Sequence, residues 1–157
     1  LRLRSITISA PLLDIAVPVP PLKKFFGELV EPLLGRLKLK NELDGKLVSH
    51  DPSVALSYDQ DPLNHGFVTP RFFVQLTHEM KRVREMKDEF PYSLMMVVPL
   101  DDKIVSVAEN LNFYRALKVK QGLKRYLCTL PNYYHESFND LGKERAFNAL
   151  SDWIAST

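Results

Sequence analysis

The most constraining feature of this sequence is an uncharged, mostly apolar run in its second half. The run reads YSLMMVV over residues 92–98 and contains no proline or glycine. A strand that is apolar in both directions must be covered on both faces, which is typical of parallel sheets in α/β proteins. A second strand-like segment, KRYLCTL, follows at 124–130. Together the two segments predict a buried parallel sheet.

Helical patterns flank these two strands. Apolar residues recur at helical spacing over 106–119 and again over 143–154. In the second of these helices we expect four side chains to face the sheet: Phe147, Leu150, Trp153 and Ile154. Strands that alternate with helices indicate an α/β fold whose sheet carries helices on both faces.

The first half of the chain predicts one more strand and a long, mostly helical insert. Residues 1–9 read LRLRSITIS, which is typical of a strand. Apolar residues recur at helical spacing over 22–34, and Thr69 with Pro70 predicts the start of another helix. Only three strands are expected, whereas open sheets average about five or six. We therefore expect the rest of a larger sheet to lie elsewhere.

Composition narrows the range of possible functions. The 157 residues are enough for one domain with a substantial core. A net charge of +2, from 21 basic and 19 acidic residues, does not indicate a nucleic-acid partner. A single cysteine, Cys128, excludes an internal disulfide and a cysteine-based metal cluster, and we expect no metal or cofactor. No uncharged stretch approaches the roughly twenty residues that a membrane-spanning helix needs.

Candidate catalytic groups follow the two apolar strands. Asp101 and Asp102 come directly after the first strand, and His135 comes after the second. Ligands of parallel α/β sheets bind outside the carboxyl ends of the strands, where these loops lie. A carboxylate that orients a histidine forms two thirds of a nucleophile–base–acid triad. Acid before histidine is also the chain order of α/β-hydrolases.

At these loops the sequence resembles a known family. The segments PLDDKIVS (99–106) and LPNYYHESFND (130–140) are similar to the monoacylglycerol lipase and lysophospholipase branch of the α/β-hydrolases, a group that resembles the serine aminopeptidase S33 enzymes. That branch has loops of the form G-x-x-D-x-[IV]-V and G-x-[HY]-H-E-x-x-x-[DE]. The segments SAPLLD (9–14) and SYDQDPLNHGFVTPRFFVQL (57–76) resemble further parts of it.

The resemblance implies roles for individual residues. Asp102 takes the place of the triad acid and His135 that of the general base, while Asp101 is only a neighbour of the acid. Glu136 is expected to support the histidine loop. Two residues depart from the family pattern, because each replaces a usual glycine and is expected to stiffen its loop: Pro99 and Asn132.

The resemblance also implies a domain organisation. Residues 1–11 are expected to form a core strand, 12–75 a helical cap insertion, and 76–157 the carboxyl-terminal part of the hydrolase core. Four apolar cap residues are expected to line an acyl-chain tunnel or to touch lipid: Phe25, Phe26, Leu29 and Leu33. The alternative is that this apolar stripe packs onto the core. Basic residues beside it suit an anionic membrane surface, so the expected location is cytoplasmic or at the periphery of a membrane.

The nucleophile motif of the family, G-x-S-x-G, is absent from these 157 residues. We therefore expect the chain to be the carboxyl-terminal part of a serine ester hydrolase of monoacyl lipids. The serine would lie on an upstream segment or on a companion amino-terminal fragment, and the chain alone would be incomplete as an enzyme. Two alternatives remain open: a non-catalytic structural or interaction subunit, and another α/β-hydrolase chemistry such as that of a peptidase or thioesterase.

Overall fold

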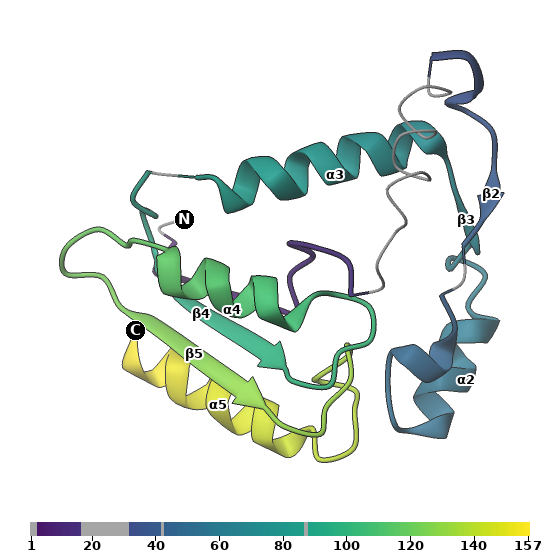
Figure 1. Cartoon of the computed structure of the whole chain (residues 1–157). Coiled ribbons are helices and arrows are strands. Elements are labelled where there is room, and N and C mark those ends of the chain that lie inside the picture. Colours follow the sequence, from purple (N-terminus) through teal and green to yellow (C-terminus); the bar gives the residue numbers. More distant parts are fainter. Residues whose placement is uncertain (1–2, 17–31, 42, 87) are drawn as a thin grey trace.

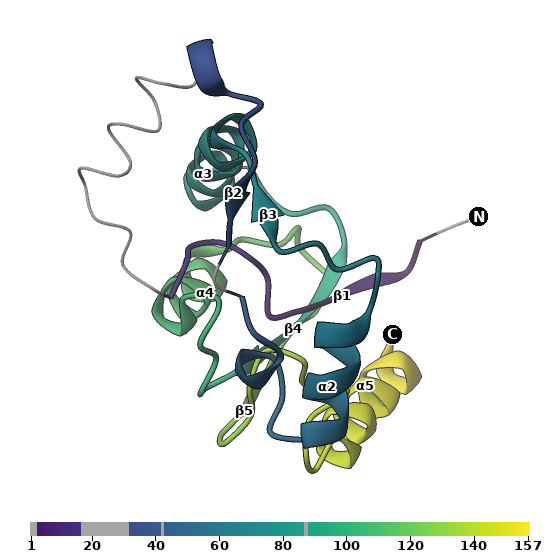
Figure 2. The same cartoon turned by 90° about the vertical axis from the view of Figure 1, so that its right-hand side faces the viewer.

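A computed structural model of the protein describes residues 3–16, 32–41, 43–86 and 88–157. Figures 1 and 2 show the chain in two perpendicular views. Its elements follow one another in this order: β1 (Ser5–Ser9), β2 (Leu39–Lys40), the 3-10 helix η1 (Gly45–Leu47), α2 (Pro52–Gln60), β3 (Phe67–Val68), α3 (Pro70–Arg84), β4 (Ser93–Pro99), α4 (Val107–Ala116), β5 (Arg125–Leu130) and α5 (Glu144–Ser156).

Within the described residues, the main sheet has three strands in the order β1-β4-β5, and both pairings are parallel. Ser5 of β1 aligns with Ser93 of β4, and Leu94 of β4 aligns with Arg125 of β5. The predicted parallel sheet is therefore confirmed. A short antiparallel pair, β2 with β3, lies beside the amino-terminal end of α3 and was not expected (Figure 2). Its strands are two residues long, which is too short for an alternating pattern to show.

The central strand β4 is buried along its whole length, as its composition predicts. Met95 and Val97 belong to a core cluster that includes Trp153 of α5. Met96 and Val98 belong to a second cluster that includes side chains of α3 and α4. Successive side chains of a strand point to opposite faces of the sheet. The uncharged run therefore supplies two cores at once, with α4 on one face and α5 on the other (Figure 1).

Polar residues cap the amino-terminal ends of α2 and α3. The Thr69 hydroxyl accepts a hydrogen bond from the Phe72 N–H at 3.2 Å, and Pro70 occupies the first turn of α3. The Asp51 carboxylate accepts from the Ser53 N–H at 2.8 Å ahead of α2. Such caps satisfy backbone donors that have no partner inside the helix. The helix start predicted at Thr69 and Pro70 is confirmed.

The inward face of α5 differs from the prediction. Trp153 is buried as expected, but Ile154 is 64% exposed and Phe147 is 50% exposed. The buried position near the start of α5 belongs to Ala146 instead. Residues 146 and 153 are seven apart and so share a face, whereas Ile154 is turned by about 100° from Trp153. Only one face of α5 meets the sheet, so a residue beside Trp153 in sequence cannot share its burial.

Part of the predicted cap lies outside the described residues. Of the helix expected over 22–34, residues 32–34 are described and are helical. The expected boundary between cap and core, at residue 75, lies within α3, which continues to Arg84 and contributes Val83 to the core. The cap and its boundary stay predictions. Among the residues that the structure describes, no helix combines the length and apolar character needed to cross a bilayer.

Candidate active site

The structure brings the two candidate catalytic residues into direct contact. Asp102 lies three residues beyond the end of β4, and His135 lies in the loop that follows β5. Neighbouring parallel strands end at the same edge of the sheet, so their following loops meet there (Figure 1). The distance between His135 Nδ1 and Asp102 Oδ2 is 2.9 Å. An acid–histidine pair therefore forms from groups 33 residues apart.

The Asp102 side chain is fully buried but well supplied with donors. Its Oδ1 accepts hydrogen bonds from the N–H groups of Ile104 at 2.7 Å and Val105 at 3.0 Å. Its Oδ2 is left for His135. A buried carboxylate is stable when its lone pairs are satisfied in this way. The local turn thus orients the carboxylate toward the imidazole.

The two ring nitrogens of His135 have different surroundings. The Asp102 carboxylate can only accept, so Nδ1 carries the proton and donates it. In the described part of the chain, Nε2 has no hydrogen-bond partner, and the side chain is 25% exposed. Burial lowers the pKa of His135, but the hydrogen bond and charge of Asp102, with the charge of Glu136, outweigh it and raise that pKa above 6.5. The imidazole is therefore both oriented and made more basic.

The acid loop and the histidine loop are tied to each other. The Asp101 carboxylate accepts from the Asn132 N–H at 2.8 Å, and the Asp101 N–H donates to the Tyr133 carbonyl at 3.2 Å. Asn132 has a φ of 62°, in the left-handed region that favours glycine. The family pattern has glycine at this position, and asparagine is one of the few other residues that adopts this conformation readily. Asp101 therefore connects the two loops to each other.

The segment that follows β1 supports the acid loop from its other side. Ala16 N–H donates to the Ile104 carbonyl at 2.9 Å, and Ser106 N–H donates to the Asp14 carbonyl at 2.8 Å. The Asp14 carboxylate is also paired with Arg84 of α3 at 3.3 Å. The segment after β1 thus holds the turn that carries Asp102, and Arg84 of α3 holds that segment in turn.

Asp140, a buried carboxylate beside this site, is not among the residues that the sequence predicts for it. It accepts hydrogen bonds from the Tyr134 N–H at 2.7 Å and the His50 N–H at 2.7 Å, and it pairs with the His50 imidazole at 3.0 Å. Burial raises the pKa of Asp140, but the bonds from Tyr134 and His50 outweigh it and hold that pKa below 3.8. The signal was present in the sequence, because Asp140 occupies the final acidic position of the histidine-loop pattern.

Glu136 lies in the loop that the family pattern predicts it to support. Its carboxylate accepts from the Asn139 side-chain amide at 3.0 Å, within the same loop. Its N–H donates to the Val48 carbonyl at 2.8 Å, which attaches the loop to the segment before α2. Glu136 thus contacts its own loop and adds negative charge close to His135.

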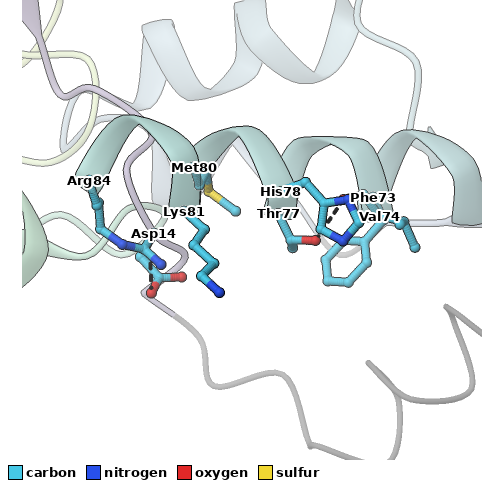
Figure 3. A pocket seen from close by; sticks show the side chains of 8 residues that line it. All are labelled: Asp14, Phe73, Val74, Thr77, His78, Met80, Lys81 and Arg84. Atoms are coloured by element: carbon cyan, nitrogen blue, oxygen red, sulfur yellow. Dashed lines mark hydrogen bonds and ion pairs between the residues drawn. The ribbon is translucent and has the colours of Figure 1, made fainter. Parts of the chain in front are cut away.

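The described part of the structure contains a cavity beside α3 and another beside the histidine loop. The first, of about 220 Å³, runs along α3, with Asp14 and Arg84 facing each other at one end and Phe73 at the other (Figure 3). The second, of about 360 Å³, lies between α2 and the histidine loop and is lined by Tyr58, Asp61 and Glu136 among others. Asp102 and His135 line neither. Within the described ranges, no group of three or more histidine, cysteine or acidic side chains is placed to hold a metal ion.

The expected lipid-contacting residues are only partly described. Leu33 is 87% exposed. Phe25, Phe26 and Leu29 lie outside the described residues. The expected contact of these four side chains with lipid or an acyl chain therefore stays a prediction.

The fold and the paired acid and histidine define the class of protein as an α/β-hydrolase. The family model described as serine aminopeptidase, S33, matches residues 2–142 of the chain. The chain belongs to this family.

Individual relatives are longer than this chain. A monoacylglycerol lipase of Mycolicibacterium smegmatis is 25% identical over 97% of the chain, which spans 53% of that protein. An uncharacterised abhydrolase domain-containing protein of Dictyostelium discoideum is 26% identical over 94% of the chain, which spans 16% of it. The crystal structure of a monoacylglycerol lipase from Paleococcus ferrophilus superimposes with a TM-score of 0.85 at 24% identity, over 97% of this chain and 58% of that one.

Proposed function

We propose that this chain supplies the acid and the base of a serine ester hydrolase that acts on monoacyl lipids. The observation that carries the proposal is the 2.9 Å contact between His135 Nδ1 and the buried Asp102 carboxylate at the carboxyl edge of a parallel sheet. Membership of a serine hydrolase family supports the class of reaction. The similarity to a monoacylglycerol lipase over 97% of the chain supports the class of substrate.

In this proposal the serine, His135 and Asp102 have separate roles in the reaction. A serine hydroxyl attacks the ester carbonyl while His135 Nε2 accepts its proton, and the same nitrogen then donates that proton to the departing alcohol. Water next attacks the acyl-enzyme with the same proton transfers, which releases the fatty acid. Asp102 holds the imidazole by Nδ1 and stabilises its charged form during each transfer.

The nucleophile is proposed to lie on a segment outside these 157 residues, upstream or on a companion amino-terminal fragment. The G-x-S-x-G motif is absent from the sequence, and the chain spans about half the length of the lipase relative. A fluorophosphonate probe that labels active serines, followed by mass spectrometry, tests this directly. We expect the probe's mass on a serine outside residues 1–157, in a preparation that hydrolyses a monoacyl ester.

Two results would contradict this part of the proposal. A single species of 18.0 kDa that hydrolyses the ester without gaining the probe would exclude a serine mechanism. A preparation with neither adduct nor turnover would favour the non-catalytic alternative.

Replacement of His135 by alanine provides the matched test of the base, because loss of a triad member costs several powers of ten in rate. Turnover that persists in His135→Ala would exclude the assignment of this residue.

The cap residues Phe25, Phe26, Leu29 and Leu33 are proposed to contact the acyl chain. Their apolar chemistry supports this proposal. The exposure of Leu33 supports it too, because the described residues leave this apolar side chain 87% exposed. Single replacement of Leu33 by serine is expected to raise KM for long-chain esters and to leave KM for acetyl esters unchanged. An equal change for both chain lengths would exclude an acyl-binding role for this residue.

Contact with a membrane surface is a further part of the proposal. In residues 33–40, exposed leucines alternate with exposed basic residues: Leu33, Leu34, Leu37 and Leu39 with Arg36, Lys38 and Lys40. Apolar side chains enter the acyl boundary while lysine and arginine meet anionic head groups. Sedimentation with anionic vesicles, weakened by Lys38→Glu and by salt, is the expected result. Equal binding to neutral vesicles would exclude the electrostatic part.

One alternative has a specific observation in its favour. The family description is that of a serine aminopeptidase, so hydrolysis of a peptide bond is the second candidate. The same triad performs both reactions, and the fold does not distinguish them. Parallel assays with a monoacyl ester and an aminoacyl amide decide between the two by their ratio of kcat/KM.

A further inference from the structure

A second histidine–carboxylate pair lies next to the first. His50 Nδ1 is 3.0 Å from Asp140 Oδ2, much as His135 Nδ1 is 2.9 Å from Asp102 Oδ2. His50 comes from the segment before α2, far from the histidine loop in sequence. Its ring stacks on that of Tyr134, with 3.6 Å between the ring centroids. The second pair therefore adjoins the residue that directly precedes His135.

Asp140 joins two distant segments through one buried carboxylate, whose side chain has no exposed surface. Its Oδ1 accepts from the His50 N–H at 2.7 Å and the Leu141 N–H at 2.8 Å, and the Ser49 hydroxyl lies 3.2 Å away. Its Oδ2 accepts from the Tyr134 N–H at 2.7 Å. In each of these contacts a donor meets an acceptor oxygen of Asp140, so loss of the carboxylate would leave several donors without partners.

The backbone is held on both sides of His135 by this segment. On one side, the Tyr134 N–H is bound to Asp140, which also binds His50. On the other side, the Glu136 N–H donates to the Val48 carbonyl at 2.8 Å. Residues 48–50 thus fix the position from which the His135 side chain reaches Asp102.

We propose that Asp140 is a positioning residue for His135, and that it works by clasping the histidine loop to residues 48–50. This inference rests on the proposed function, because it takes His135 to be the catalytic base. It assigns no catalytic step to Asp140 or His50. The clasp matters because the base must lie within hydrogen-bonding distance of both Asp102 and the serine hydroxyl. A displacement of about 1 Å in such a group lowers the rate by roughly 100-fold.

The sharpest test is Asp140→Asn in the complete enzyme. Asparagine keeps the shape, but its amide nitrogen must face an N–H donor of Tyr134 or His50. We expect kcat to fall about 100-fold with KM within about threefold of wild type. We also expect the midpoint of the kcat/KM pH profile to move to lower pH, because His135 is held less closely to the Asp102 charge.

Two further variants provide the comparison. His50→Ala removes one partner of Asp140 but leaves the Tyr134 N–H bound, so a smaller loss of about tenfold is expected. It decides the matter if Asp140→Asn fails to fold. Asp51→Asn changes a half-buried carboxylate next in sequence to His50, and asparagine caps a helix equally well. This control should match wild type in kcat and in pH midpoint.

The outcomes distinguish a failure of the positioning role of Asp140 from a failure of the proposed function. Fluorophosphonate titration counts the active sites in each preparation. If Asp140→Asn or His50→Ala only lowers that count, with kcat per active site and pH midpoint unchanged, the role is merely structural and the inference is wrong. If His135→Ala itself retains turnover, the proposed function fails instead.

Discussion

At the scale of single residues, the site depends on a few backbone and side-chain details. The Asp102 carboxylate is oriented by two backbone N–H groups, and Asn132 adopts a left-handed conformation where the family pattern has glycine. These details place the acid and base within hydrogen-bonding distance. A single replacement at Asp102 or at Asn132 should therefore have a measurable effect.

Replacement of Asp102 by asparagine should lower kcat on the order of 10,000-fold, because the amide can favour the wrong imidazole tautomer. The base works when neutral, so activity rises with pH through the pKa of His135, which lies above 6.5 in the wild type. Without the Asp102 charge the lowering effect of burial prevails, and the midpoint moves to lower pH. The kcat/KM pH profile measures this. An unchanged midpoint would show that Asp102 does not set the basicity of His135.

Replacement of Asn132 by alanine should lower the free energy of unfolding by about 1–2 kcal/mol, because alanine carries the Cβ that disfavours a left-handed conformation but lacks the short polar side chain that lets asparagine adopt it. Replacement by glycine should leave stability within about 0.5 kcal/mol, since glycine adopts this conformation without a Cβ. Denaturant unfolding of the two variants side by side is the measurement. Equal stability of both variants would contradict the argument.

At the scale of elements, β4 connects the two halves of the core. Its alternate side chains enter the cluster with α5 and the cluster with α3 and α4. The same strand ends at Pro99, close before the turn that carries Asp102. Packing of β4 therefore determines both the stability of the sheet and the place of the acid.

Replacement of Met96 by alanine should lower the free energy of unfolding by about 2–5 kcal/mol, because it leaves a cavity in a fully buried position. Met86 follows α3 and is 42% exposed, so Met86→Ala provides a control that should change stability by less than about 0.5 kcal/mol. Thermal or denaturant unfolding compares the two. Similar losses in both would show that β4 is not the centre of the core.

At the scale of the whole molecule, contacts between distant segments hold the site together. Asp14 and Arg84 support the acid loop, and Asp140 attaches the histidine loop to residues 48–50. These contacts join segments from the beginning, the middle and the end of the chain. The site is therefore a property of the assembled fold, and its charged groups link stability to pH.

Acid should weaken the molecule partly through Asp140, whose pKa in the folded protein lies below 3.8. A lowered pKa contributes stability that is present above the unfolded value of about 3.9 and is lost as pH falls through the folded value. The stability difference between wild type and Asp140→Asn should therefore shrink below about pH 4. Unfolding measured from pH 7 to pH 2 tests this. Asp152→Asn, at an exposed position on α5, serves as control, and a difference that stays constant would contradict the linkage.

Local pattern was sufficient for much of the fold. The run at 92–98 predicted a buried strand, and Thr69 with Pro70 predicted the start of α3, because burial on both faces and helix capping leave local signatures. The inward face of α5 was predicted less well. Ile154 is exposed because the sheet covers only one side of that helix, which no pattern within 143–154 specifies.

The sequence by itself determined the residue types of the site and their order, an acid after one strand and a histidine after the next. Only the tertiary structure decided which of these groups are hydrogen-bonded to each other. It pairs Asp102 with His135, connects the two loops through Asp101, and pairs Asp140 with His50. The physical reason is distance along the chain. Chain order shows which groups follow which strands, but a contact such as that of His50 with Asp140, 90 residues apart, depends on strand register and loop packing.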